Sequence, residues 1–179
     1  MKMKKFIILM LICIGMMCST VHAQHVAYIS REVPTHNSSF KTYMDAKALH
    51  KSSPQYKFIQ EYGYIDENGF YRCAAEPDFG VTDDYYLVAM GSYYTRTVGD
   101  KFRVTTDTGR VFYVAVADFK ADAHTDSKHQ YTRRNGDVIE CIVNTKTLLP
   151  EVRRMGTCNV FMPLNGSIAK VEKMNFILE

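Results

Sequence analysis

A continuous apolar segment, Tyr86–Met90, and the β-hairpin signal that follows it constrain the fold of this chain more than any other feature. An unbroken apolar run of this length is typical of a strand that is buried on both faces. Further on, Lys101–Thr105 alternates as a strand does, Asp107–Gly109 has the composition of a turn, and Arg110–Ala117 returns as a strand rich in Val, Phe and Tyr. The sequence therefore predicts a β-sheet core organised around this stretch.

Short strand patterns and turn signals occupy most of the remaining chain. Further strands are predicted at Tyr62–Ile65, Phe70–Cys73, Val138–Val143, Asn159–Met162 and Ser167–Met174. Short helices are predicted at Phe40–His50 and at Leu148–Met155, while residues 55–64 fit either a strand or a helix. Short strands without a βαβ rhythm predict a mainly β fold, a small closed six-stranded β-barrel, with a β-sandwich as the alternative.

The N-terminal segment has the pattern of a secretory signal peptide. Met1–Lys5 carries three lysines, Phe6–Met17 is almost wholly apolar, and Val21–Ala23 ends in the small-x-small pattern of a cleavage site. A lipid anchor at Cys18 is the weaker reading, because Met17 stands where a small residue is wanted. We expect cleavage before Gln24 and export to the periplasm or out of the cell.

Removal of this segment changes the charge of the protein. The full chain has 22 Lys and Arg against 19 Asp and Glu, and the signal segment takes three lysines and no acid. The mature chain is thus formally neutral. Nucleic-acid binders usually carry a clear basic excess, so we expect no nucleic acid among the partners.

Three cysteines remain in the mature chain, namely Cys73, Cys141 and Cys158. They cannot all pair internally, and none forms the CxxC pair of a zinc ribbon. Cys141 lies within an apolar strand pattern and is expected to be a small buried hydrophobe. If one disulfide forms, Cys73 with Cys158 is the expected pair.

The candidate catalytic residues are two acids within or at the edge of apolar strands, Asp118 and Glu140. An acid in apolar surroundings loses hydration, which raises its pKa and lets it hold a proton for general-acid catalysis. Paired carboxyl groups of this kind cleave glycosidic bonds. The alternative is that Glu140 simply faces outward from a half-buried strand.

A polar cluster after the second hairpin strand supplies candidate substrate-binding residues: Asp122, His124, Asp126 and Tyr131. If the segment were extended, the first three would point to one side and offer two carboxylates and an imidazole to a metal ion. The alternative is a solvated loop in which the acids cap turns, and we expect neither a metal nor another cofactor. A nucleophilic role for Cys141 or Cys158 is less expected than burial of both thiols.

Parts of the chain resemble known families. The segments 37–44, 86–94, 98–102, 107–109 and 118–126 resemble a family of uncharacterised exported or phage-associated bacterial proteins, which carries no activity over to this chain. A weaker resemblance links Asp118, Gly136, Glu140 and Leu148–Gly156 to the double-psi β-barrels, which include the three-aspartate domain of peptidoglycan-cleaving enzymes, the lytic transglycosylase A group and rare lipoprotein A. The chain lacks the family's Asp-Thr-Gly-Gly run and has Glu where the family has Asp.

This resemblance implies a double-psi barrel over residues 55–179, preceded by the signal peptide 1–23 and by a leader with a short helix, 24–54. It also implies an exported cell-envelope protein that cleaves the glycan strands of peptidoglycan, with Glu140 as general acid and base and Asp118 as its partner. The alternative is a module without catalytic activity that binds cell-wall glycan or another protein. Whether the chain is an enzyme stays open at this point.

Overall fold

The protein is a nine-stranded, open, mixed β-sheet with two short α-helices, seen in a computed structural model that describes residues 24–34 and 40–178. The strands are β1 Gln24–Arg31, β2 Phe40–Asp45, β3 Gly63–Ile65, β4 Tyr71–Cys73, β5 Tyr85–Met90, β6 Lys101–Thr106, β7 Val111–Phe119, β8 Asp137–Val143 and β9 Ile168–Leu178. The helices are α2 Pro54–Tyr62 and α3 Pro150–Met155. None of the helices in this described part of the chain is both long and apolar enough to cross a membrane.

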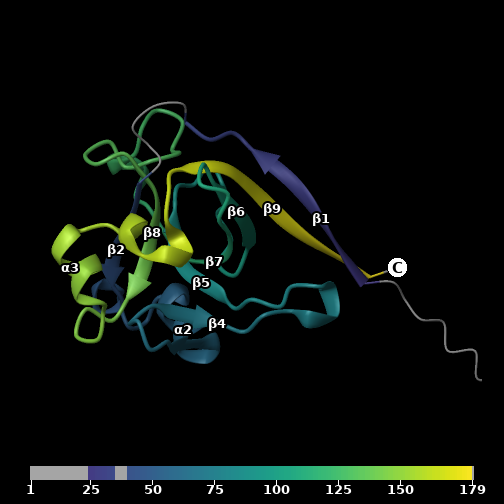
Figure 1. Ribbon diagram of the computed structural model, residues 1–179, viewed down its shortest axis with the longest axis horizontal. Coiled ribbons are helices and arrows are strands. Elements are labelled where there is room, and N and C mark those ends of the chain that lie inside the picture. The colour runs from purple at the N-terminus through teal and green to yellow at the C-terminus, as the bar shows by residue number, and fades with distance from the viewer. Residues whose placement is uncertain (1–23, 35–39, 179) are drawn as a thin grey trace, which may run out of the picture.

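Strand β5 is the branch point of the sheet. The strand order is β1-β9-β6-β7-β5-β4-β3, and β5 also pairs with β8, which in turn pairs with β2 (Figure 1). All six residues of β5 are buried, as the unbroken apolar run predicts. The strand pairs in parallel with β7 and antiparallel with β4 and β8.

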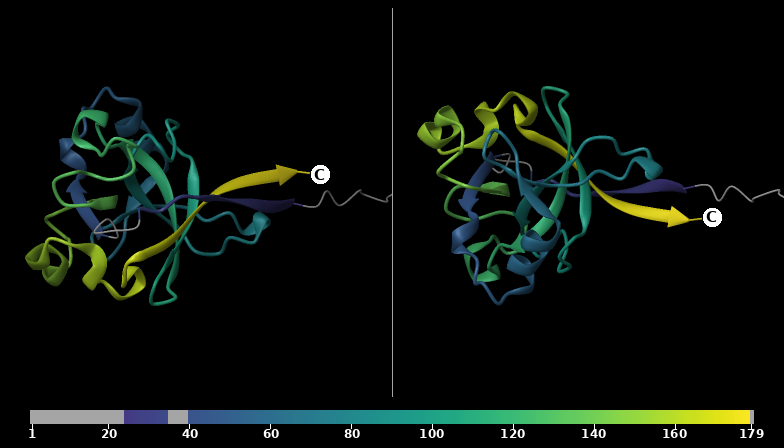
Figure 2. Two further views of the ribbon diagram at one scale, coloured as in Figure 1. Left: turned by 90° about the horizontal axis from the view of Figure 1, so that it is seen from above. Right: turned by 90° about the horizontal axis from the view of Figure 1, so that it is seen from below.

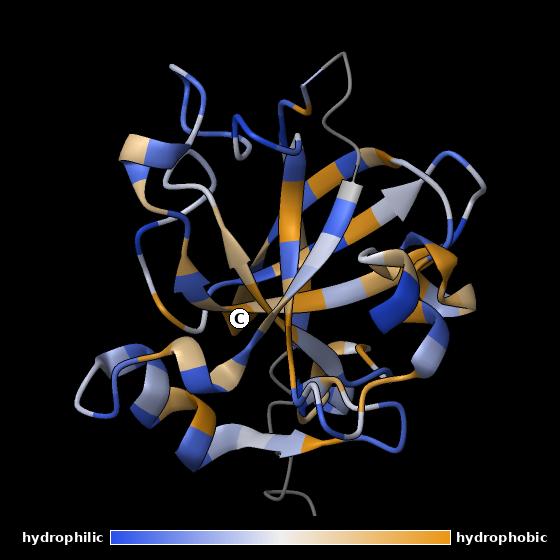
Figure 3. Cartoon of the chain, turned by 90° about the vertical axis from the view of Figure 1, so that its left-hand side faces the viewer, coloured by the Kyte–Doolittle hydropathy of each residue, from blue (hydrophilic) through white to orange (hydrophobic). Residues whose placement is uncertain are grey.

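The two faces of β5 carry two different cores. Alternate residues point to opposite faces of a strand, so Val88 belongs to one cluster of buried residues and Leu87 to the other. Buried residues of α3 and of the 3₁₀ turns after it join the Val88 core, and Ile59 of α2 joins the Leu87 core. Hydrophobic residues accordingly concentrate along the central strands, whereas the connecting loops are mostly hydrophilic (Figure 3).

The prediction of a closed barrel is wrong. The sheet path ends at β1 and at β3, and these two strands do not pair with each other in the described residues. Instead, β1 pairs with β9 along its whole length, and the two strands project together from the body as a long ribbon (Figure 2). The structure has nine strands where six were expected, and strand patterns in a sequence do not say which strand edges meet. This sheet branches at β5 rather than closing.

Two local predictions also need correction. The helix expected at Phe40–His50 is strand β2 and a 3₁₀ turn, because pairing with β8 overrides a helical spacing of apolar residues. Ser53 and Pro54 begin α2 instead, with the Ser53 side chain accepting a hydrogen bond from the N–H of Tyr56 at 3.1 Å. The strand expected at Asn159–Met162 consists of 3₁₀ turns.

Other local predictions are confirmed. The β6–β7 hairpin turns at Gly109, which has a φ of 79°, and its N–H donates to the carbonyl of Thr106 at 3.0 Å. Helix α3 ends at Gly156 in the left-handed conformation, with a φ of 68°. The strands expected at Tyr62–Ile65 and Phe70–Cys73 are present as β3 and β4, and their hairpin turns at Asp66–Gly69. The signal peptide predicted at residues 1–23 lies outside the described residues.

The core packing predicts the effect of a substitution at Phe102 of β6. Its ring is fully buried in the Val88 core, so Phe102→Ala should leave a cavity and lower the free energy of unfolding by about 3–5 kcal/mol. Val111 lies in the same hairpin but is exposed, so Val111→Ala should change little. Urea unfolding of both variants tests this, and equal losses would contradict the packing described here.

Candidate functional site

The structure brings the two predicted catalytic acids, Asp118 and Glu140, to the same place in the sheet. Asp118 of β7 and Glu140 of β8 are both register partners of Ala89 in β5, one on each side of it. Residues directly opposite each other on paired strands point to the same face, and two strand spacings separate their Cα atoms by roughly 10 Å. The small side chain of Ala89 lies between the two acids.

A buried lysine holds this group of acids together. The ammonium of Lys120 lies 2.9 Å from Asp137 Oδ2 and 3.6 Å from Glu140 Oε2, and it donates to Thr132 Oγ1 at 3.2 Å. The side chains of Lys120 and Asp137 are only 3% and 1% exposed. The same Asp137 oxygen accepts a hydrogen bond from the Thr42 hydroxyl, whereas Oδ1 has no partner among the described residues.

Both predicted acids have raised pKa values. Burial raises the pKa of Asp118, and the N–H of Phe119 and the charge of Lys120 only partly oppose this effect. Burial also raises the pKa of Glu140, with Asp137 and Asp118 acting in the same direction and Lys120 against them. The environment therefore favours the protonated form of each acid, as a general acid needs.

The position of Lys120 limits what these acids can do. A glycosidase holds its substrate between two carboxyl groups. Here the Lys120 ammonium lies beside Glu140, and the Glu140 side chain is 30% exposed. The four charged groups therefore form an ion cluster near the end of β5, which we call the Lys120 cluster: Asp118, Lys120, Asp137 and Glu140.

The predicted substrate-binding residues are not gathered around this cluster. Asp122 accepts hydrogen bonds from Ser92 Oγ at 2.6 Å and from Arg96 at 3.2 Å, which help hold its pKa low against the small opposing effect of burial. His124 is exposed and lines a shallow hollow together with Arg133 and Arg134. The spacing of Asp122 and His124 in the sequence did not indicate these partners and neighbours.

Asp126 and Tyr131 belong to a loop with an internal structural role. Asp126 Oδ1 accepts hydrogen bonds from the N–H groups of Gln130, at 2.6 Å, and Tyr131, at 3.0 Å. Its other oxygen accepts from the N–H of Lys128 at 3.0 Å. These bonds hold the pKa of Asp126 below its usual value although burial opposes them. Asp126 thus caps the loop, and Tyr131 packs partly buried against the Val88 core.

Asp122, His124 and Asp126 do not form a metal site. The first two lie in a 3₁₀ turn and the third in the loop after it, so the alternation of an extended segment is lost. Residues 24–34 and 40–178 contain no cluster of three or more His, Cys, Asp and Glu side chains that could hold a metal ion.

A large pocket next to α2 was missed by the analysis of the sequence. It has a volume of about 600 Å³, and we call it the Lys101 pocket. Its lining residues are Phe58, Tyr62, Cys73, Ala74, Ala75, Glu76, Val98, Gly99 and Lys101. They come from α2, from the end of β4 and the segment after it, and from the loop that leads into β6 together with the first residue of β6. They are so far apart in the chain that no sequence motif could join them.

The Lys101 pocket has an aromatic wall and a polar base. Phe58 and Tyr62 lie one helical turn apart on α2 with ring centroids 5.1 Å apart, and Tyr62 is 55% exposed. Glu76 forms an ion pair with Lys101 and accepts a hydrogen bond from the Tyr85 hydroxyl. The Lys101 ammonium also lies 4.8 Å from the centroid of the Tyr85 ring. Burial lowers the pKa of Lys101.

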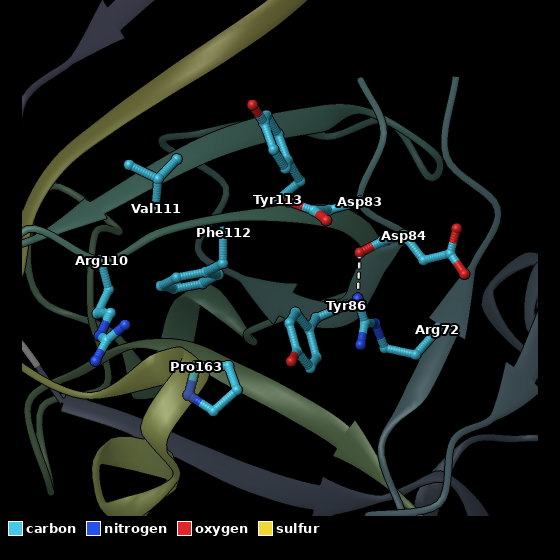
Figure 4. A pocket seen from close by; sticks show the side chains of 9 residues that line it. All are labelled: Arg72, Asp83, Asp84, Tyr86, Arg110, Val111, Phe112, Tyr113 and Pro163. Atoms are coloured by element: carbon cyan, nitrogen blue, oxygen red, sulfur yellow. Dashed lines mark hydrogen bonds between the residues drawn. The ribbon is translucent and has the colours of Figure 1, made fainter. Parts of the chain in front are cut away.

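A second pocket, of about 250 Å³, lies on the other side of the sheet around Arg72 and Tyr86 (Figure 4). The Arg72 guanidinium stacks on the Tyr86 ring at 3.6 Å from its centroid. One guanidinium nitrogen donates a hydrogen bond to Asp66 Oδ2 at 3.5 Å, and another donates to the carbonyl of Asp84. This pocket is smaller than the Lys101 pocket, and its Arg72 guanidinium is already bound by groups of the protein itself.

The cysteines do not pair as expected. Cys73 lies in the Leu87 core and Cys158 in the Val88 core, so the sheet separates them, and Cys73, Cys141 and Cys158 are all buried free thiols. The expectation that Cys141 is buried is confirmed. Burial raises the pKa of Cys73 to about 11, which makes its thiol a poor nucleophile.

Comparisons of the chain with protein-family models, with curated proteins and with solved structures found no match. Any function must therefore be argued from the geometry of the Lys120 cluster and the two pockets.

The Lys120 cluster predicts a strong dependence of stability on its lysine. Lys120→Met should lower the free energy of unfolding by about 3–5 kcal/mol, because it leaves the buried Asp137 carboxylate without its counter-charge. Lys128→Met removes an exposed pair with Glu32 and should leave the unfolding midpoint unchanged. Chemical denaturation of both variants measures the difference, and a midpoint for Lys120→Met equal to that of the wild type would contradict a buried ion pair.

The raised pKa of Glu140 predicts a pH-dependent effect of Glu140→Gln. A raised pKa means that the folded state binds more protons than the unfolded state at pH values above the ordinary 4.5, so ionisation of Glu140 destabilises the fold as the pH rises through that range. The melting temperature of the variant should therefore rise relative to the wild type between pH 4 and pH 7.5.

Glu172 provides a control of opposite sign. Burial raises its pKa, but hydrogen bonds from Lys170 and Arg103 outweigh this effect and leave the pKa lowered. Its ionisation therefore stabilises the fold as the pH rises, so Glu172→Gln should lose stability relative to the wild type between pH 4 and pH 7.5. The same direction of change for both variants would argue against the assignment.

Proposed function

We propose that this protein is an exported module of the cell envelope that binds glycan strands in the Lys101 pocket without cleaving them, with peptidoglycan as its partner. The observation that carries the proposal is the combination of the exposed Tyr62 ring, supported by the partly buried Phe58, with a fixed ion pair in the largest pocket described above. Export is the expectation from the N-terminal sequence, and it places the protein where such glycans occur.

The aromatic wall suits the apolar face of a sugar ring. An aromatic side chain offers a flat surface of low conformational entropy, and in an exposed position this surface is available to a ligand. Tyr62 is such a residue, and Phe58 supports it from the preceding turn of α2. Gly99 lies against Phe58, since a Cβ atom at this position would lie 3.3 Å from the ring.

The polar base suits the hydroxyl and amide groups of a sugar. Glu76 accepts hydrogen bonds and Lys101 donates them, and their ion pair orients both side chains before a ligand arrives. Ligand sites commonly combine an apolar lining with a few oriented polar groups. Because the base carries one charge of each sign, it favours a neutral ligand over a strongly charged one.

Cleavage of glycan strands at Asp118 and Glu140 is the second candidate function. The observation that favours it is that the two acids flank Ala89 on one face of the sheet and both have raised pKa values. It ranks second because the Lys120 ammonium lies beside Glu140, where a substrate would need access.

Binding to purified sacculi tests the proposal. The protein should pellet with sacculi, and Tyr62→Ala should weaken this binding by about tenfold or more, because it removes the stacking surface. Met162→Ala is the matched control, since it removes a 61% exposed apolar side chain next to residues of the other core. Equal binding by Tyr62→Ala and the wild type would remove the Lys101 pocket from the proposal.

The same incubation separates binding from cleavage. The soluble fraction is analysed by mass spectrometry for wild type and Glu140→Gln. Pelleting without glycan fragments supports the binding module. Fragments that disappear in Glu140→Gln would establish the second candidate in its place, and an absence of both pelleting and fragments would overturn both.

A further inference from the structure

Two buried cysteines from distant parts of the chain meet in the Val88 core. Cys141 lies in β8, and Cys158 begins a 3₁₀ turn after α3. Both side chains belong to the Val88 core and are at most 1% exposed. The Cys141 thiol is close enough to raise the pKa of Cys158.

Backbone geometry brings the two thiols to the same spot. Cys158 Sγ donates to the carbonyl of Thr42 in β2 at 3.3 Å, and the next residue of β2, Tyr43, is the register partner of Cys141. The two sulfur atoms therefore lie over adjacent positions of the paired strands β2 and β8. This arrangement does not depend on a flexible surface loop.

The neighbours of Cys158 hold it in this position. Thr157 Oγ1 donates to the carbonyl of Lys41 at 3.0 Å, and the N–H of Lys41 donates to Asn159 Oδ1 at 3.1 Å. The Lys41 side chain is fully buried and donates to the carbonyl of Gly166 at 2.5 Å. The residues on both sides of Cys158 are thus bound to one residue of β2.

We propose that Cys141 and Cys158 form a disulfide when the protein folds in an oxidising compartment, and that Cys73 remains a free thiol. The inference uses the expected export of the chain and is independent of the proposed glycan binding. It also accounts for the odd number of cysteines in the mature chain, because Cys73 lies in the other core, across the sheet.

The oxidant is a disulfide, either a thiol–disulfide oxidoreductase or oxidised glutathione. One cysteine thiolate attacks this disulfide, forms a mixed disulfide and releases one thiol of the oxidant. The second cysteine thiolate then attacks the protein sulfur of the mixed disulfide and releases the other thiol. The protein loses two protons and two electrons, and the oxidant is reduced to two thiols.

Burial determines when this reaction takes place. Neither thiol is accessible in the folded protein, and the neighbouring Cys141 thiol and burial raise the pKa of Cys158 well above its usual value, so the folded dithiol reacts slowly. Oxidation therefore accompanies folding. Once formed, the disulfide should resist reductants until the protein is unfolded.

Oxidative refolding with peptide mapping tests the proposal. The purified chain is reduced in denaturant, refolded with reduced and oxidised glutathione, treated with N-ethylmaleimide in denaturant and digested with trypsin. Cleavage after Lys and Arg places the three cysteines in separate peptides, 73–96, 135–146 and 155–170. We expect the last two peptides to be joined and peptide 73–96 to carry the label.

Variants make the outcome specific. Cys73→Ser should leave the joined peptides unchanged, whereas Cys158→Ser should leave peptide 135–146 labelled. Reduction should lower the melting temperature of Cys73→Ser by roughly 6–12 °C, as expected for a disulfide that closes a loop of this length, and should not affect Cys158→Ser. Label on all three peptides, or a link that includes Cys73, would overturn the proposal.

Discussion

Strand β5 is completely buried, and the sheet and both hydrophobic cores are arranged around it. Its six residues have no exposed face, so both faces need a core and both edges need partners. Pairing with β7 on one edge, and with β4 and then β8 on the other, satisfies the backbone and makes the sheet branch. A polar backbone group left unpaired in such a position would cost about 1–3 kcal/mol.

Both candidate sites are consequences of this branching. The Lys120 cluster forms where β7 and β8 flank the end of β5 at Ala89, and the acids there lose hydration because the sheet on which they lie is buried. The Lys101 pocket forms where α2 covers the Leu87 core next to β4 and β6. In the Lys120 cluster, the lysine lies against Glu140 and limits the access of a ligand. The Lys101 pocket is open to a ligand. Because of this difference, binding is proposed ahead of cleavage.

Some of the residues at the candidate sites could be predicted from the sequence, and others could not. The pairing of Asp118 with Glu140 followed from two acids within or at the edge of apolar strands, and the sheet register places them on either side of one residue. Lys120 was not foreseen, because nothing in the sequence distinguishes it from an exposed lysine. The Lys101 pocket was also missed, since its aromatic wall and its polar base are contributed by segments that only the fold brings together.

Apolar runs and turn residues, which act over a few positions, specify the local elements: the buried strand β5, the β6–β7 hairpin and helix α3. Long-range pairing keeps the sheet open and makes Phe40–Asp45 a strand. It also brings Cys141 and Cys158 into one core. The physical reason is range: helix and turn preferences depend on neighbours in the chain, whereas strand pairing and burial depend on residues that can be a hundred positions away.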